Sequence, residues 1–277
     1  MTTISVAEDE GWNVLHAIVD CVWIEKPDIK DRDQKFELAM KLSNRLTKEI
    51  GIPLEFEDMY DFIAFLPSRM HNSGSLTKYW AHGNNGLKLR GIEARQHSTC
   101  EWIRQIQSGA LEILTNCVKG GEPVNSLAIQ KRIMKMFQSE LHLLESGCID
   151  PSRLVLTRRV SKNIGDFSVK TITLCALLRA KRLGHGVDPG RKIKFVVTKS
   201  QNSDPLSKII LAEELQNYVQ VPINVPHYKS LAQRAIWAIL GPFGWTDEEI
   251  SKGVKKITLF DFFNSLDSKS SVDDSAY

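Results

Sequence analysis

The residues best suited to chemistry in this sequence are cations, and they are concentrated in one stretch. Residues 153 to 199 include twelve Lys and Arg and only two acidic residues, Asp166 and Asp188. The segment after Trp245 has the opposite balance, with seven acidic residues against four lysines. This separation favours a polyanion such as nucleic acid, held by one part of the chain and repelled by the other. The alternative is a solvated lysine-rich surface, on which the two signs are more often mixed.

Length and composition limit the class of protein. With 277 residues, 42% hydrophobic and 25% charged, the chain predicts one large globular domain or two modest ones. No stretch reaches the roughly 18 apolar residues that a membrane span requires, so no membrane contact is expected. The N-terminus, Met1 to Gly11, is acidic and resembles no signal or transit peptide, which predicts a cytoplasmic (nucleoid) protein. The five scattered cysteines predict free thiols, not a disulfide framework or a zinc site.

The first hundred residues predict a mixture of strands and one helix. Trp12 to Ile24 is rich in β-branched and aromatic residues, as in a strand, and Gln34 to Ile50 carries a helical apolar stripe that ends at Gly51. Further strand-like pieces follow at residues 54–57, 61–66, 76–81 and 87–94. A turn-rich segment, residues 82–86, separates the last two, which predicts antiparallel pairing.

From Ser98 onward the apolar period becomes helical. Helices are predicted at residues 102–117, 126–145, 168–183 and 224–240, with extended segments at 154–160 and 191–199. The Ser- and Asp-rich end, residues 252–277, is not expected to fold alone. The predicted fold class is therefore α+β.

Several motifs in the same order along the chain resemble those of family B DNA polymerases. Residues 90–99 (RGIEARQHST) resemble the R/K-G-I/L-E-x-R-R motif at the palm–thumb junction, and residues 76–81 (LTKYWA) resemble the K-K-x-Y motif. Residues 154–162 (LVLTRRVSK) resemble the thumb segment L-V-I-T-K-x-L-S-K. The resemblance continues through residues 179–197 and 228–244, and its closest form is the archaeal one. It covers the chain from about Trp12 to Trp245.

This resemblance implies a domain arrangement and a set of DNA contacts. Residues 1–97 correspond to the end of the palm, with antiparallel strands and a helix. Residues 98–245 correspond to a mostly helical thumb, and residues 246–277 to a flexible tail. A polymerase holds a duplex without reading its sequence, so contacts to phosphates dominate. The implied DNA-binding residues are Lys78, Tyr79, Arg90 and Arg95 near the primer end, and Thr157, Arg158, Arg159 and Lys162 further back.

The metal-binding motif of the family is altered here. Family B enzymes carry Y-G-D-T-D-S on a palm hairpin, where carboxylates help bind two magnesium ions that clamp the attacking and leaving oxygens. The aligned residues are His16 to Cys21, with Ile18 in place of the first aspartate. The second aspartate is kept as Asp20, which is the one candidate catalytic residue and Mg²⁺ ligand. The alternative is that Asp20 belongs to a site that no longer binds metal.

Other parts of the enzyme are missing from the sequence. The palm motif D-x-x-S-L-Y-P and the fingers motif K-x-x-x-N-S-x-Y-G do not occur, and one carboxylate cannot hold two hard cations. The chain alone is therefore not expected to polymerise DNA. Some archaeal members of the family are encoded as two polypeptides, and the length and acidic leader favour the small subunit of such a split polymerase, with a large subunit and primer–template DNA as partners. The alternative is a catalytically inactive, DNA-binding module derived from the same fold.

Two further expectations follow. Residues 256–263 (KITLFDFF) resemble the sliding-clamp-binding box, with Leu259, Phe262 and Phe263 as the apolar anchors and Lys256 in place of glutamine. The alternative is that these three side chains pack back on the thumb. A partial palm cannot cover its own sheet, so the palm portion is expected to expose a sheet edge and an apolar face.

Overall fold

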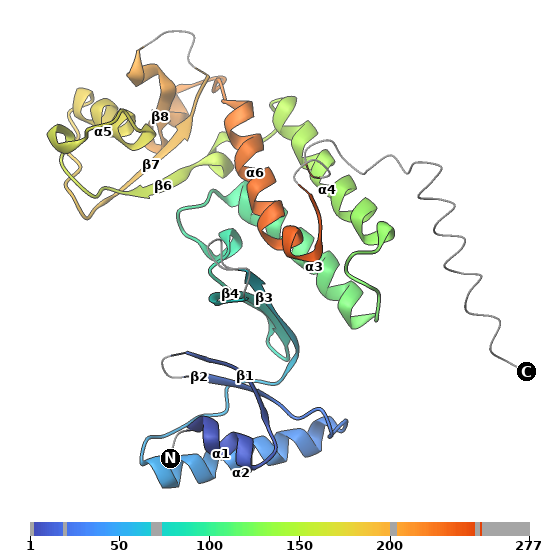
Figure 1. Ribbon diagram of the computed structural model, residues 1–277. Helices are drawn as coiled ribbons and strands as arrows, with labels where there is room; N and C mark the ends of the chain where they lie inside the picture. Colours follow the sequence, from blue (N-terminus) through green and yellow to red (C-terminus); the bar gives the residue numbers. More distant parts are fainter. Residues whose placement is uncertain (1–2, 19–20, 68–73, 200–203, 247–249, 251–277) are drawn as a thin grey trace, which may run out of the picture. The chain divides into compact units, whose positions relative to one another are not determined.

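The computed structural model describes residues 3–18, 21–67, 74–199, 204–246 and 250 (Figure 1). The chain divides into two compact units, Met1–Arg95 and Gln96–Tyr277. The division falls two residues before the boundary that the sequence predicts. Helices and small antiparallel sheets occur in both units, so the predicted α+β class is confirmed.

Within its described residues, unit 1 contains two antiparallel sheets and two helices. The elements in chain order are α1 (Thr3–Asp9), β1 (Asn13–Ile18), β2 (Cys21–Glu25), α2 (Arg32–Ile50), β3 (Tyr60–Pro67), β4 (Gly74–Gly83), β5 (Gly86–Arg90) and the 3₁₀ turn η1 (Glu93–Arg95). β1 and β2 form a hairpin, and β3, β4 and β5 form a three-stranded sheet in that order. α2 begins where the Asp31 carboxylate accepts the Gln34 N–H at 2.7 Å and ends at Gly51 in the left-handed conformation.

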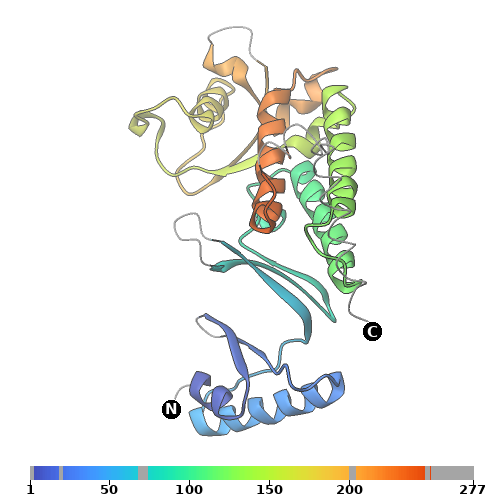
Figure 2. The same ribbon diagram turned by 45° about the vertical axis from the view of Figure 1, so that its right-hand side comes forward.

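The β1–β2 hairpin lies between the helices of unit 1 and the β3–β4–β5 sheet (Figure 2), and it has apolar neighbours on both faces. Val14 and Ile24 pack on one face against the helix-side cluster, which consists of Val6, Ala7, Trp12, Leu42 and Leu46. On the other face the hairpin contributes two rings to the aromatic cluster, made by His16, Trp23, Tyr60, Phe65 and Tyr79. The hairpin is therefore the middle layer of unit 1, between α1 and α2 and the β3–β4–β5 sheet.

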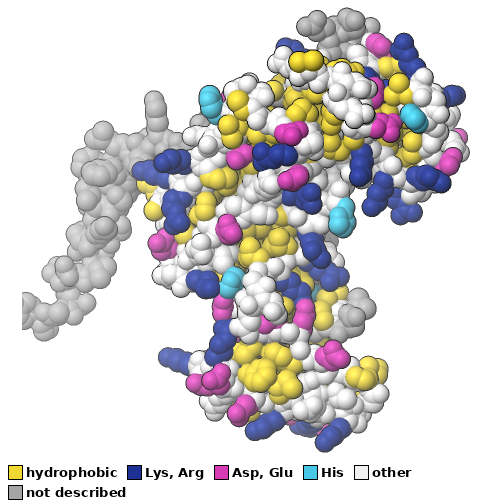
Figure 3. All heavy atoms as spheres, turned by 180° about the vertical axis from the view of Figure 1, so that it is seen from behind, with side chains coloured by type: hydrophobic (Ala, Val, Ile, Leu, Met, Phe, Trp, Pro, Cys, Tyr) yellow, Lys and Arg dark blue, Asp and Glu magenta, His cyan; other side chains and the backbone are white. Residues whose placement is uncertain are grey.

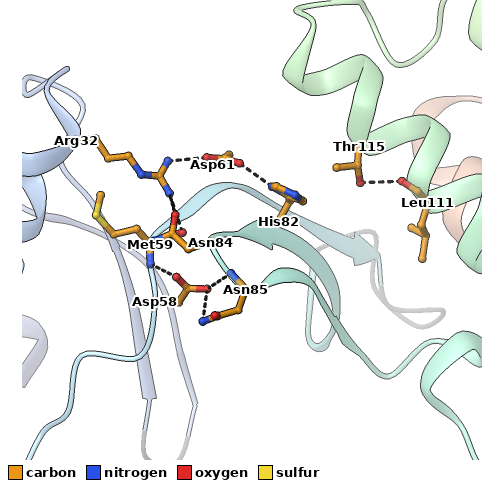
Figure 4. A network of polar contacts seen from close by, with 9 residues as sticks. All are labelled: Arg32, Asp58, Met59, Asp61, His82, Asn84, Asn85, Leu111 and Thr115. Atoms are coloured by element: carbon orange, nitrogen blue, oxygen red, sulfur yellow. Dashed lines mark hydrogen bonds and ion pairs between the residues drawn. The ribbon is translucent and has the colours of Figure 1, made fainter.

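A polar network fixes the start of α2 to the β3–β4 pair (Figure 4). The Arg32 guanidinium donates to Asp61 Oδ1 at 2.7 Å and to Asn84 Oδ1 at 2.5 Å, and Asp61 Oδ2 lies 2.6 Å from His82 Nδ1. Burial opposes ionisation of Asp61, but hydrogen bonds from Arg32 and His82 outweigh it and lower the pKa of this carboxyl.

Unit 2 combines a helical bundle with a third sheet. Its helices and strands are α3 (Glu101–Lys119), α4 (Leu127–Glu145), β6 (Leu156–Arg159), α5 (Ile172–Arg182), β7 (Lys192–Val197), β8 (Ile209–Leu211) and α6 (Val225–Leu240). Its 3₁₀ turns are η2 (Pro151–Leu154), η3 (Ile164–Asp166), η4 (Pro205–Lys208), η5 (Ala212–Asn217) and η6 (Gly241–Phe243). α3, α4 and α6 pack side by side, and α5 packs against β7 and β8 (Figures 1 and 2). The bundle core includes Trp102, Ile106, Phe137 and Ile236, all at most 1% exposed.

One buried hydroxyl connects the bundle to the sheet. Tyr228 of α6 is completely buried, and its hydroxyl donates to the Leu154 carbonyl at 2.8 Å and accepts the Val197 N–H at 3.0 Å. Burial raises the pKa of this hydroxyl, which therefore stays neutral and can serve both partners. A single side chain thus satisfies buried backbone groups of η2 and β7.

Some predicted elements differ from the structure. The strand predicted at Leu54–Glu57 is wrong, because side chains of α2 bind this backbone: Thr47 Oγ1 accepts the Leu54 N–H at 2.9 Å, and Ser43 Oγ donates to the Leu54 carbonyl. The run predicted as one strand at 12–24 is the β1–β2 hairpin. The helix predicted from residue 168 begins at Ile172, because Thr171 is its N-cap. α1 and β8 were not predicted.

Two expectations about chain class can be compared with the structure. All five cysteines are unpaired, as predicted; Cys100, Cys117 and Cys175 are buried, whereas Cys148 is exposed. Among the described residues, no helix combines the length and apolar composition needed to cross a bilayer.

Candidate nucleic-acid interface

The β6–β7 pair aligns basic and hydroxyl side chains on one face of its sheet. Thr157 lies opposite Lys194, and Arg159 lies opposite Lys192. Directly opposite residues of an antiparallel pair share a face, so these four side chains project from the same face. Arg159, Lys192 and Lys194 are exposed, and we call these four residues the basic strand face. Like charges opposite each other destabilise a sheet, which makes this arrangement costly until an anion is bound.

Arg158 projects from the other face of β6 and has a different environment. Its Nη1 donates to the Ser98 carbonyl at 2.9 Å and to the Thr157 carbonyl at 3.1 Å. The bond to Ser98 attaches β6 to the segment that leads into α3. The structure therefore does not bring Arg158 together with Thr157 and Arg159, although the three are consecutive.

Lys162 and the cations of α5 belong to the stretch of sequence that connects β6 to β7. The Lys162 ammonium lies 5.0 Å from the centre of the Phe167 ring, a cation–π distance, and its side chain is half-buried. Lys181 and Arg182 are exposed at the end of α5. Figure 3 shows Lys and Arg side chains gathered over the part of unit 2 that contains α5 and the β6–β7–β8 sheet.

Arg179 is an exception within this basic stretch. Its guanidinium donates two bonds to the Glu214 carboxylate at 2.7 and 2.8 Å, and further bonds to the Leu206 and Ile209 carbonyls and to the Tyr218 hydroxyl. Burial opposes ionisation of Glu214, but the bonds from Arg179 and from the Leu211 N–H outweigh it and lower the pKa of the carboxyl. All five guanidinium donors are occupied within unit 2, so Arg179 is structural.

In unit 1, the β4–β5 register separates the other predicted DNA contacts. Tyr79 lies opposite Arg90, whereas Lys78 projects from the other face of β4. Tyr79 is only 1% exposed, with its ring centre 5.4 Å from that of Trp23 and 5.8 Å from that of Phe65. Arg90 and Arg95 are exposed, and Lys78 is half-buried. Lys78, Arg90 and Arg95 are therefore accessible, while the Tyr79 ring belongs to the aromatic cluster.

Gly91 explains the glycine of the R-G-I-E motif. Its φ of +70° lies in the left-handed region, and a Cβ atom there would lie 2.1 Å from the Thr77 carbonyl oxygen and 2.9 Å from Lys78 Cγ. Only glycine fits where the chain leaves β5 so close to β4. The glycine therefore permits the close approach to Thr77 between Arg90 and Arg95.

The altered metal motif lies on the β1–β2 hairpin. Asp20 lies outside the described residues. Ile18, at the end of β1, pairs with Cys21, at the start of β2. His16, at the position of the family's tyrosine, is 3% exposed and makes edge-on contacts with Phe65 and Tyr79, at 5.0 and 6.1 Å between ring centres. Its ring nitrogens have no hydrogen-bond partner within the described part of the chain. His16 thus fills the aromatic cluster as an apolar ring would.

The described residues do not provide a metal site. Within them, no group of three or more His, Cys, Asp or Glu side chains is placed to hold an ion. A two-magnesium centre needs several carboxylate and water oxygens around each ion, and the one candidate ligand, Asp20, lies outside the residues that were described. The predicted clamp anchors Leu259, Phe262 and Phe263 lie outside the described residues.

Two residues of the basic strand face were missed as candidate contacts. Lys192 and Lys194 belong to the alternating sequence K-I-K-F-V-V, which indicates a strand with one solvent face. That alternation could have identified them. Their position beside Thr157 and Arg159 depends on a pairing between residues about 35 positions apart, which the pattern alone does not specify.

Comparisons with known proteins agree with the motifs. The model of DNA polymerase family B matches residues 17–242. DNA polymerase 2 of Aeropyrum pernix is 23% identical over 261 residues, which cover 94% of this chain and 29% of that protein. The solved structure of the family B DNA polymerase from Pyrobaculum calidifontis shares the fold, with a TM-score of 0.53, 15% identity, and coverage of 92% of this chain and 28% of that one.

The chain therefore spans less than a third of the length of these relatives. With the family model matching most of its residues, the chain belongs to DNA polymerase family B.

Proposed function

We propose that this chain is the palm-end and thumb subunit of a split family B DNA polymerase, and that unit 2 grips primer–template duplex through the basic strand face. The observation that carries the proposal is the β6–β7 register, which sets three exposed cations and one hydroxyl on a single face. Long cationic side chains and hydroxyls bind phosphate oxygens without reading base sequence. Lys162 extends the grip within unit 2, and Lys78, Arg90 and Arg95 of unit 1 are proposed as separate phosphate contacts. Tyr79 and Arg158 contribute through the packing described above.

The DNA-binding part of the proposal predicts strongly salt-dependent, sequence-independent affinity for duplex DNA. Each phosphate contact that is lost reduces the slope of log affinity against log salt by about 1. We expect Arg159→Gln and Lys192→Gln to lower affinity and flatten this slope. Lys135→Gln removes the same charge from the exposed side of α4 and is the matched control. Equal affinity at low and high salt would contradict the proposed grip.

The catalytic part of the proposal depends on a second polypeptide. We propose that a large subunit supplies the other palm carboxylate and the fingers, and that Asp20 joins it in binding a divalent cation, Mg²⁺ in the family. Primer extension with magnesium, this chain and a polypeptide carrying the missing motifs tests this, with Asp20→Ala in parallel. Extension that needs both chains and disappears with Asp20→Ala supports a working split enzyme.

The altered motif favours a second candidate function. Ile18 replaces a family aspartate, and His16 is packed as a ring in the aromatic cluster. The alternative is a catalytically inactive module that supports replication through DNA and sliding-clamp contacts. No extension by the mixture, with duplex binding intact, would select this function.

The tail proposal is independent of catalysis. We propose that Leu259, Phe262 and Phe263 bind a sliding clamp, as the resemblance of residues 256–263 implies. Calorimetric titration of a clamp protein with the full chain and with Phe262→Ala tests it; unchanged affinity of the variant would reject the box. We also propose that the chain is located in the nucleoid, because the proposed substrate is DNA.

A further inference from the structure

A cavity of about 510 Å³ lies in unit 2 where the end of α4, the turn η2 and the start of α6 meet. Ligand pockets commonly have volumes of about 300–1,000 Å³. Buried apolar side chains line the inside of this cavity, namely Leu144, Ile149 and Leu154, each at most 4% exposed. The segment 215–223 forms another wall, in which Tyr218 is 37% exposed and Val219 is fully exposed. The cavity is therefore apolar inside and open to solvent beside this segment.

The charged side chains that line the cavity are all acidic. Among the described residues, its lining includes Glu145 and Asp150 and no Lys or Arg. Both side chains are exposed, and Glu145 forms an exposed ion pair with Lys229 at 3.1 Å. The Asp150 carboxylate accepts the Ser152 N–H at 2.8 Å, which lowers the pKa of the carboxyl. An apolar cavity beside two carboxylates fits a peptide in which apolar side chains follow cations.

One segment of this chain has that pattern. Residues 251–260 (SKGVKKITLF) lie outside the described residues, and their sequence contains three lysines and no acidic residue. Ile257, Leu259 and Phe260 follow the last of these lysines within four positions. The remainder, residues 261–277, has four acidic residues against one lysine. Only the first part of the tail is therefore complementary to the cavity in both charge and apolar character.

The tail begins at a place from which it reaches the cavity. Trp245 and Ile250, which follow α6, are 3% and 2% exposed, so the chain is still part of folded unit 2 at Ile250. α6 has 16 residues and rises about 1.5 Å per residue, so its two ends are about 23 Å apart. The nine residues from Ile250 to Leu259 span up to about 30 Å when extended. This length is enough to pass from the end of α6 to its start, where Val225 lines the cavity.

We propose that residues 252–260 dock in this cavity of their own chain. The three apolar side chains cover its buried lining, and the lysines before them lie beside Glu145 and Asp150. The docking itself depends neither on catalysis nor on DNA. One consequence rests on the proposed function: Leu259 is also an anchor of the clamp-binding box, so a docked tail cannot bind a clamp at the same time. The docked form is then autoinhibited for clamp binding.

Hydrogen exchange of the full chain tests the docking. The amides of residues 215–223 are compared in the wild type, in Ile257→Asp and in Val272→Asp. Val272 is the matched control, because it is a β-branched apolar residue of the same tail that lies beyond the proposed segment. We expect Ile257→Asp to accelerate exchange of these amides by at least about threefold, because the cavity loses its cover. Val272→Asp should exchange as the wild type does.

A charge exchange tests the contact between the lysines and the carboxylates. Lys256→Glu and Glu145→Lys should each accelerate exchange of residues 215–223, and the double variant should restore part of the protection, because the two signs are exchanged. Glu145→Lys removes only an exposed ion pair, so unit 2 should stay folded. Additive effects of the two substitutions would contradict this contact.

The remaining outcomes separate docking from clamp binding. Equal exchange in the wild type and in Ile257→Asp would overturn the docking. Protection that increases with protein concentration would assign the cavity to the tail of a second copy and overturn docking within one chain. Glu145→Lys leaves the clamp-binding box unchanged and should bind a clamp protein more tightly than the wild type; equal affinity would overturn the autoinhibition. A clamp protein that binds neither would reject the clamp proposal, while protection measured without a clamp would still support the docking.

Discussion

Replacing Tyr228 by phenylalanine removes one hydroxyl from the centre of unit 2. The ring is fully buried, so phenylalanine keeps its packing, but the Leu154 carbonyl and the Val197 N–H each lose a partner. A buried backbone group without a partner costs about 1–3 kcal/mol. With two groups affected, we expect unfolding of unit 2 to become easier by about 2–4 kcal/mol. For a unit of this size, the melting temperature should fall by roughly 5–15 °C.

Tyr218→Phe is the matched control for this prediction. It also removes one hydroxyl, but Tyr218 is 37% exposed, and its partner Arg179 keeps its two bonds to Glu214. Tyr218→Phe should change the free energy of unfolding of unit 2 by no more than about 1 kcal/mol, because water can replace an exposed hydroxyl.

Differential scanning calorimetry measures both variants, and hydrogen exchange localises the change. The Val197 amide should exchange faster in Tyr228→Phe than in Tyr218→Phe, because only the first variant removes its acceptor. Equal melting temperatures for the two variants, or an unchanged Val197 amide, would refute the assignment of Tyr228 as the connection between α6, η2 and β7.

Three other predictions concern glycine geometry, acid stability and the two adjacent arginines. Gly91→Ala should destabilise unit 1 strongly, because the new Cβ would clash with the Thr77 carbonyl. Gly86→Ala is the control: its φ is +87° and nothing lies within 4 Å of the new Cβ, so it should cost only the backbone strain of about 1–2 kcal/mol. Similar urea midpoints for the two variants would contradict this prediction. The Glu214 carboxyl has a lowered pKa in the folded state, so its stabilising effect should be complete above its ordinary value of 4.5 and be lost as pH falls through the folded value. Urea titrations should therefore show Glu214→Gln destabilising unit 2 more at pH 7 than at pH 3. Glu145→Gln, which breaks an exposed ion pair with Lys229, should change stability by less than about 1 kcal/mol at pH 7. Arg158→Gln should lower thermal stability through loss of its bond to Ser98. Arg159→Gln should lower duplex affinity without lowering stability, because it also removes one of two like charges that lie opposite each other. The reverse pattern would exchange the two roles.

The sequence predicts elements well where local signals are strong. α6 was predicted to within one residue because Asn224 can cap it and Gly241 follows it. The Leu54–Glu57 strand was wrong because hydrogen bonds from α2 side chains replace the ladder, and a pattern of apolar residues carries no information about them. β8, three apolar residues between two 3₁₀ turns, is too short to produce a period.

The candidate site was predictable in kind but not in arrangement. The excess of cations and the motif order indicate a surface that binds DNA, but consecutive residues diverge once the strand forms. Arg158 turns inward and Arg159 outward, and Arg179 is neutralised by a carboxylate 35 residues away. Tyr79 is one of the residues predicted to contact DNA, and its ring lies among aromatic residues from two sheets. The direction and the partners of each of these side chains depend on which strands and helices pack together, and the spacing of residues along the sequence does not specify that.

The position of the hairpin between two clusters has a consequence for synthesis on the ribosome. The helix-side cluster needs only residues 6–46 and can close early, but the aromatic cluster also needs Tyr60, Phe65 and Tyr79. Trp23 and His16 therefore emerge from the ribosome some 40 to 60 residues before the rings that cover them. During that interval, the nascent chain presents an aromatic strand surface of the kind that chaperones recognise and that promotes aggregation.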